Sequence, residues 1–92
     1  MATFFALPKL GMNQEDGELV RWLVSEGAHV TAGQPILEVE TDKATVELES
    51  PAEGIVARIL RREGDIVPIN GVVAVILAPG EEMPTEIPDA IA

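Results

Sequence analysis

Short runs of alternating hydrophobic and polar residues, separated by turns that contain glycine or proline, make up most of the chain. Alternation with a period of two is typical of half-buried β-strands, and these runs are rich in β-branched residues. Apolar residues at helical spacing never persist over the length of a helix. The pattern predicts strands at Phe4–Leu7, Glu18–Ser25, His29–Val30, Ile36–Val39, Thr45–Glu49, Ile55–Arg62, Val67 and Val72–Leu77. In Glu18–Ser25 the alternation is imperfect, which predicts a β-bulge or burial on both faces.

The strand pattern occurs twice. Residues 17–40 align with residues 54–77 without a gap, at an offset of 54 − 17 = 37. The identical pairs are Gly17/Gly54, Arg21/Arg58, Leu23/Leu60, Glu26/Glu63, Gly27/Gly64 and Val30/Val67. Two copies are too few for a solenoid. We therefore predict an all-β domain, a β-sandwich or flattened barrel with pseudo-two-fold symmetry, in which each half covers the apolar face of the other.

Composition narrows the possible functions. Ninety-two residues suffice for one small domain, and a formal charge of −10 makes nucleic acids and anionic membrane surfaces poor partners. The chain has no cysteine and one histidine, His29, so it offers no thiolate site and no histidine cluster for a metal. The longest apolar run is too short to cross a bilayer, and the first residues do not resemble a signal peptide. We expect a soluble, intracellular protein.

The five residues Glu40, Thr41, Asp42, Lys43 and Ala44 connect two predicted strands and favour a tight hairpin turn. They are also the connection between the two repeats, so the symmetry places Lys43 at one pole and the chain ends at the other. Lysine in a surface turn is common, and an ordinary exposed lysine is the simplest interpretation. However, Lys43 is one of only two lysines in the chain, which makes its position on the symmetry axis a candidate site.

Acidic residues surround this turn. A carboxylate constellation for acid–base catalysis is one interpretation, but alternating strand residues on a solvated face are usually acidic for solubility, and no cleft is predicted. We therefore predict no catalytic residue and no metal site. The residues concerned are Glu40, Asp42, Glu47 and Glu49.

The composition changes after residue 78. Residues 79–92 contain three prolines and four acidic residues, with no basic residue and no strand pattern. Prolines stiffen an extended backbone, and like charges repel one another. We predict a domain over residues 1–78 and the start of a flexible linker over residues 79–92.

Three motifs together resemble the lipoyl domains of 2-oxo acid dehydrogenase complexes. They are Leu7–Met12 (LPKLGM), Glu40–Thr45 (ETDKAT) and Glu49–Pro51 (ESP), with Glu63–Asp65 (EGD) adding to the match. The resemblance covers roughly residues 3–78. It implies a flattened β-barrel of two four-stranded antiparallel sheets (a barrel-sandwich hybrid). It also implies that Lys43 carries lipoate in amide linkage. The residues implied to contribute to recognition of this attachment site are Glu40, Thr41, Asp42 and Ala44.

The resemblance implies a carrier, not an enzyme. In this family the lipoyl-lysine arm accepts an acyl group from a thiamine-diphosphate 2-oxo acid decarboxylase and delivers it to an acyltransferase. Dihydrolipoamide dehydrogenase then reoxidises the arm. The implied partners are the decarboxylase, dihydrolipoamide dehydrogenase, and a lipoate ligase or lipoyl transferase. The implied contact of the decarboxylase is the loop from Gly11 to Asp16. The expected location is the bacterial or archaeal cytoplasm, or the mitochondrial matrix for a processed eukaryotic protein.

Two alternatives share the fold. A biotin carrier domain has methionines beside its lysine, whereas Asp42 and Ala44 flank Lys43 here. An unmodified lipoyl-like module of membrane transport adaptors would carry a long helical insertion, and no such pattern occurs. Asp42–Val46 (DKATV) most resembles the acyltransferases of pyruvate dehydrogenase or acetoin dehydrogenase complexes.

Overall fold

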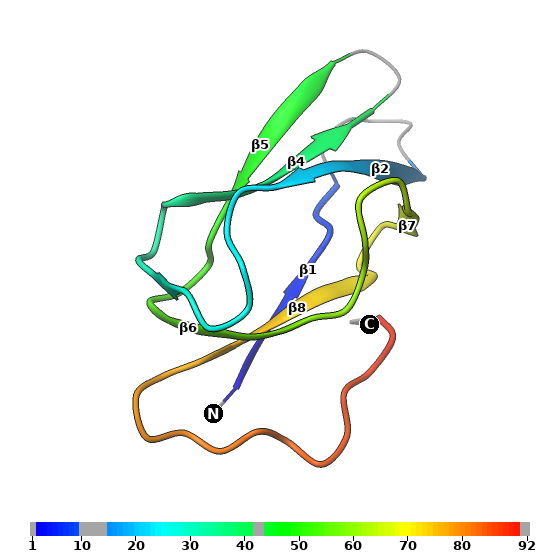
Figure 1. The fold of residues 1–92 in the computed structure, drawn as a ribbon. Coiled ribbons are helices and arrows are strands. Elements are labelled where there is room, and N and C mark those ends of the chain that lie inside the picture. Colours follow the sequence, from blue (N-terminus) through cyan, green and yellow to red (C-terminus); the bar gives the residue numbers. More distant parts are fainter. Residues whose placement is uncertain (1, 10–14, 42–43, 91–92) are drawn as a thin grey trace.

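The computed structural model describes residues 2–9, 15–41 and 44–90, which form two packed antiparallel β-sheets (Figure 1). The strands are β1 (Thr3–Ala6), β2 (Asp16–Trp22), β3 (His29–Val30), β4 (Pro35–Glu40), β5 (Thr45–Glu49), β6 (Gly54–Ile59), β7 (Ile66–Pro68) and β8 (Val72–Leu77). Sheet A has the order β1-β8-β6-β3, and sheet B has the order β5-β4-β2-β7. The all-β prediction of two four-stranded antiparallel sheets is confirmed. Within the described ranges, no helix has the length and apolarity needed to span a membrane.

The two sheets are built from equivalent strands in the same order, which explains the internal repeat. The offset of 37 relates β2 to β6, β3 to β7 and β4 to β8, and the remaining strands β1 and β5 occupy matching edges. The short strands are exchanged: β3 pairs with β6 in sheet A, and β7 pairs with β2 in sheet B. Because each half contributes one strand to the sheet of the other, neither half can complete its sheet alone.

The repeated glutamates connect the two halves. The Glu63 carboxylate accepts a hydrogen bond from the backbone N–H of Trp22 at 3.0 Å, and Glu26 accepts one from that of Ile59 at 2.8 Å. These two bonds are equivalent under the pseudo-symmetry, since 26 + 37 = 63 and 22 + 37 = 59. The glycine after each glutamate has a positive φ, 91° in one turn and 93° in the other, a conformation that favours glycine.

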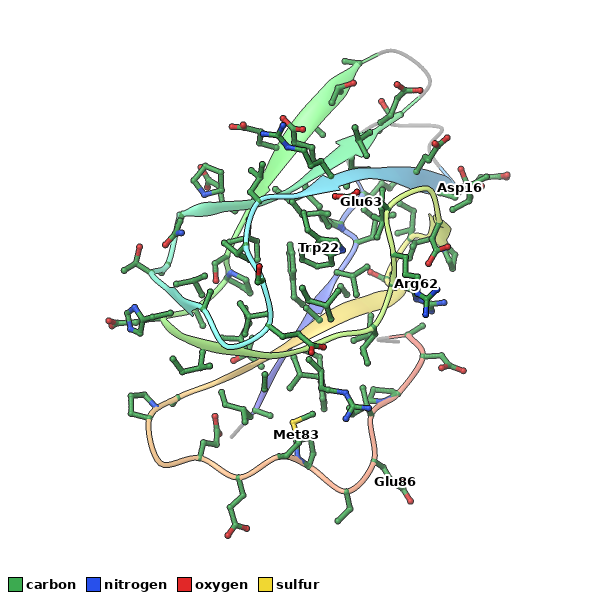
Figure 2. All side chains as sticks on the ribbon, viewed as in Figure 1. Asp16, Trp22, Arg62, Glu63, Met83 and Glu86 are labelled. Atoms are coloured by element: carbon green, nitrogen blue, oxygen red, sulfur yellow. The ribbon has the colours of Figure 1, made fainter. Side chains whose placement is uncertain are left out.

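Aliphatic side chains fill the space between the sheets. The core cluster contains mainly Val, Leu and Ile from both sheets. The Trp22 ring packs against this cluster, and its Nε1–H donates to the Arg61 carbonyl at 3.0 Å. Trp22 is half-buried, and Figure 2 shows its ring between the sheets. The predicted bulge is confirmed by the register shift between Leu19 and Arg21, where β2 pairs with β4.

Two strands end earlier than predicted. β2 stops at Trp22 instead of Ser25, and β6 stops at Ile59 instead of Arg62. The reason is topological: the next strand in each case belongs to the opposite sheet, so the chain must leave its own sheet and cross the edge of the sandwich. β2 also begins earlier than predicted, at Asp16 instead of Glu18, so Gly17 lies within the strand, opposite Val67.

Residues 79–90 return along the sandwich after β8. The backbone carbonyl of Asp89 accepts a hydrogen bond from the N–H of Val72 at 2.8 Å, and Gly71 and Ala90 form an isolated antiparallel bridge. Figure 1 shows this segment passing along the side of sheet A that faces away from sheet B. The predicted division into residues 1–78 and a linker over residues 79–92 stays a prediction.

Candidate functional site

The hairpin of β4 and β5 carries the candidate site. Its register pairs Leu37 with Leu48 and Glu40 with Thr45, so the two strands reach the connection in step. Beyond the last pair, Thr41 forms two hydrogen bonds with the Ala44 carbonyl, from its backbone N–H at 2.9 Å and from its hydroxyl at 3.1 Å. These bonds tie the two ends of the connection together with only two residues between them.

The structure places three of the five predicted site residues. Glu40 and Ala44 are exposed, and Thr41 is half-buried because its hydroxyl turns back to the Ala44 carbonyl. Asp42 and Lys43 lie outside the described residues. The structure therefore describes the residues on either side of the predicted attachment position, Thr41 and Ala44, but not the position itself. Among the described residues, no group of three or more histidine, aspartate or glutamate side chains could hold a metal ion.

The outer face of sheet B beside this hairpin is acidic. Glu38 lies directly opposite Glu47 across β4 and β5, and Glu40 lies directly opposite Glu18 across β4 and β2. Like charges in directly opposed positions destabilise a sheet. Arg21 offsets part of this repulsion, since its Nε lies 3.7 Å from Oε1 of Glu38. The four glutamates and one arginine leave a net charge of 1 − 4 = −3 on this patch.

The edge of sheet B adds two exposed apolar side chains that the sequence analysis did not single out. Ile66 of β7 is 66% exposed and lies opposite Glu18, while Val20, at the bulge of β2, is 40% exposed. Asp16, the last residue of the predicted contact loop, lies opposite Pro68 on the same two strands. Residues 10–14 of that loop lie outside the described residues. Alternation within β7 was the available signal for Ile66, because its neighbour Val67 is fully buried.

A family model described as "Biotin-requiring enzyme", which covers biotin and lipoyl domains, matches residues 3–76. The chain belongs to this biotin/lipoyl family. The match spans all eight strands except the last residue of β8, so the family assignment and the fold describe the same part of the chain.

Curated relatives within the biotin/lipoyl family are acetyltransferase components. The chain is 40% identical over 86 residues to the dihydrolipoyllysine-residue acetyltransferase component of the acetoin cleaving system of Cupriavidus necator. It is 45% identical over 80 residues to the corresponding component of the pyruvate dehydrogenase complex of Rhizobium meliloti. These matches cover 94% and 86% of this chain but only 23% and 18% of the relatives. The chain thus spans about a fifth of the length of these proteins.

Two solved structures share the fold. The lipoyl domain of the 2-oxoglutarate dehydrogenase complex of Azotobacter vinelandii superposes with a TM-score of 0.67 at 27% identity, over 80% of this chain and 94% of that one. The urea carboxylase of Kluyveromyces lactis superposes with a TM-score of 0.72 at 26% identity, over 84% of this chain and 6% of that one. The fold therefore fits the biotin/lipoyl family as a whole and does not by itself distinguish its members.

The described hairpin fits covalent attachment at its tip. A group attached through a side-chain amide needs an exposed residue on an ordered support, and it needs no pocket of its own. Glu40 and Ala44 are exposed on either side of the connection, and the bonds between Thr41 and Ala44 fix its ends. The arrangement can present a modified side chain to another protein, which is the task of a carrier domain and not of an enzyme.

Proposed function

We propose that this chain is a lipoyl carrier domain in which Lys43 bears lipoate through an amide bond. The observation that carries the proposal is the β4–β5 hairpin, closed by Thr41 and Ala44 around the two residues that include Lys43. The similarity to acetyltransferase components supports it. So does the pair Asp42 and Ala44, which replaces the methionines expected beside a biotinylated lysine.

The domain serves a 2-oxo acid dehydrogenase complex, with pyruvate or acetoin as the source of the acyl group. Lipoate, when attached, supplies a dithiolane whose sulfurs can carry an acyl group between active sites. This chain's residues hold the attachment point on an ordered hairpin and present it to successive partners. Those partners are the decarboxylase, the acyltransferase core of the parent protein, dihydrolipoamide dehydrogenase and the lipoylating enzyme. A tether raises the effective concentration of the domain at each of them.

A reductive acylation assay tests this proposal. The lipoylated domain is incubated with the decarboxylase of a pyruvate dehydrogenase complex and labelled pyruvate, and bound label is counted. We expect label on the wild-type domain and on a Lys9→Arg variant, and none on Lys43→Arg. Equal labelling of Lys43→Arg would refute the attachment site.

The acidic face of sheet B is proposed to guide partners that have basic surfaces. The opposed glutamate pairs cost stability, yet they lie on the strands that lead to the β4–β5 connection, where complementary charge accelerates encounter with a partner. Amidation also removes the charge of Lys43, so the glutamates do not serve mainly as its ion-pair partners. We expect Glu40→Lys to lower the rate of acylation at low salt by about tenfold, and the loss to shrink as salt rises.

Charge reversal far from the hairpin is the matched control. Glu86 is exposed and points away from the sandwich in Figure 2, so Glu86→Lys changes the net charge equally. If Glu86→Lys slowed acylation as much as Glu40→Lys, net charge and not the acidic face would set the rate.

Ile66 and Val20 are proposed as the apolar part of the decarboxylase contact. They lie on the same edge as Asp16, where the predicted contact loop rejoins the sheet. Exposed aliphatic side chains beside a charged surface are typical of a small protein interface. We expect Ile66→Ser to raise the KM of the decarboxylase for the domain severalfold with the fold intact, and lipoylation by a ligase to be unaffected. An unchanged KM would remove Ile66 from the contact.

Biotin attachment is the second candidate, because the family model that matches residues 3–76 is described as "Biotin-requiring enzyme". The hairpin geometry suits either group, so the residues that flank Lys43 must decide. Biotinylation of Lys43 by a biotin ligase at a rate comparable to lipoylation would favour this alternative.

A further inference from the structure

The outer faces of the two sheets differ in a way that the pseudo-symmetry makes easy to see. In sheet B the outward positions of β4 are Pro35, Glu38 and Glu40, and in sheet A the equivalent positions of β8 are Val72, Val75 and Leu77. The edge strands show the same contrast. The outward residues of β5 are Thr45, Glu47 and Glu49. β1 pairs with β8 as β5 pairs with β4, and these registers relate β5 to β1 by an offset of 49 − 6 = 43. The counterparts in and before β1 are therefore Ala2, Phe4 and Ala6.

The outer face of sheet A is buried despite its position. Val72 and Val75 are 1% and 0% exposed, as fully buried as the core, yet neither belongs to the cluster between the sheets. Phe4, directly opposite Val75, is only half-buried. A second layer must therefore cover this face, and it covers β8 most completely.

Residues 79–90, here called the strap, form that layer. Met83, Pro84 and Ile87 are half-buried, while Glu82 and Glu86 between and beside them are exposed. Figure 2 shows Met83 pointing toward sheet A and Glu86 pointing away from it. The strap thus has an apolar side and an acidic side, although it has no regular secondary structure over residues 81–84.

Local sequence sends the strap back along the sheet. Pro79 and Gly80 stand at the two central positions of a turn in which the Glu81 N–H donates to the Ala78 carbonyl at 3.0 Å. Proline followed by a glycine with φ of 80° is the signature of a type II turn. The Glu81 carboxylate closes the turn further by accepting from the Ala78 N–H at 2.8 Å. At the far end, the bond from Val72 N–H to Asp89 and the Gly71–Ala90 bridge fix the strap.

We propose that the strap is a built-in partner of sheet A, docked by its apolar side on the Val72–Val75 strip, and not the freely mobile start of a linker. Two consequences follow from the geometry. The folded unit extends to about Ala90, and a continuing chain leaves the domain beside Gly71, at the opposite end of β8 from Leu77. The Gly71 carbonyl accepts a hydrogen bond from the N–H of Leu7, the residue after β1. The exit therefore lies next to the start of the loop that follows β1.

Hydrogen exchange of single amides in the full chain tests the strap. In the wild type, the Val72 N–H donates to the Asp89 carbonyl of the strap at 2.8 Å, so its protection measures docking. We expect Met83→Ser combined with Ile87→Ser to speed exchange of the Val72 amide at least about tenfold, which corresponds to roughly 1.4 kcal/mol. The Leu23 amide, which bonds to Ile36 in sheet B, should keep its protection and shows that the sandwich stays folded.

Two further variants separate docking from nonspecific effects. Glu82→Ser combined with Glu86→Ser changes two exposed residues of the same segment and should leave exchange at Val72 unchanged. Gly80→Val leaves the apolar contacts intact but disfavours the turn, since a β-branched residue rarely adopts a positive φ, and it should release the strap. An unprotected Val72 amide in the wild type, or unchanged protection in Met83→Ser/Ile87→Ser, would overturn the proposal.

Discussion

Single residues explain why the repeat is visible in the sequence at all. The glutamates at 26 and 63 are identical because each binds a backbone N–H of the other half, a role that neither leucine nor lysine could take. The glycines that follow them supply positive φ angles. The sequence predicted that these positions were equivalent. It could not predict their partners, because those lie 33 and 41 residues away and depend on how the halves are exchanged.

Removing one of these carboxylates should destabilise the fold measurably. We expect Glu63→Ala and Glu26→Ala each to lower the free energy of unfolding by about 1 kcal/mol, because each leaves a backbone N–H without its charged acceptor. Urea denaturation measures the effect, with Glu82→Ala on the exposed strap surface as the control. A loss of unfolding free energy no larger than that of Glu82→Ala would show that these two hydrogen bonds do not stabilise the fold.

The backbone of Leu77 lies so close to Gly54 that there is no space for a Cβ atom at this position. A Cβ at this position would meet the Leu77 carbonyl oxygen and, at 2.9 Å, its carbon, and backbone atoms there cannot move aside without breaking the β6–β8 pairing. We expect Gly54→Ala to cost roughly 2 kcal/mol or more in urea denaturation. Gly64→Ala, which has open space but a φ of 93°, should cost less, about 1 kcal/mol. The reverse order would contradict the packing argument.

At the level of strands, alternation located all eight elements but not their ends. Pattern alone could not show that the chain leaves its sheet after Trp22 and Ile59, because the crossing is imposed by the exchange of β3 and β7. Glu40 and Glu47 were assigned to a solvated face, and the structure adds that they stand directly opposite Glu18 and Glu38. Register, which the sequence does not reveal, decides that arrangement.

The opposed glutamates give a prediction at the scale of a strand pair. Glu47→Lys replaces a like-charged pair with Glu38 by an opposite-charged one, so we expect it to raise the free energy of unfolding by about 0.5 kcal/mol at low salt. High salt should abolish the gain. Denaturation of wild type and variant at two ionic strengths measures it, with Glu86→Lys as a control outside this face. A loss of stability at low salt would contradict the account of the acidic face.

The whole molecule is a symmetric sandwich with unequal outer faces. The symmetry places the β4–β5 hairpin away from the start of β1 and the end of β8, where Thr3 lies opposite Ile76 (Figure 1). The prediction that both chain ends lie at that pole is wrong for the C-terminal side, because residues 79–90 return to Gly71 at the other end of β8. The candidate site was predictable because a short connection between two repeats is visible in sequence. The strap was not, since proline and acidic residues are equally typical of a mobile linker. The burial of Val72 and Val75 and the hydrogen bond from Val72 to Asp89 distinguish the two cases.

Intact mass spectrometry tests the central claim, that the hairpin presents Lys43 for lipoylation. The chain is incubated with lipoate, biotin and both ligases, weighed, and mapped by peptide analysis. We predict one lipoyl group per chain, located on Lys43, retained in Lys9→Arg and lost in Lys43→Arg with the fold unchanged. A biotin adduct, a lipoyl group on another residue, or no adduct at all would contradict the account.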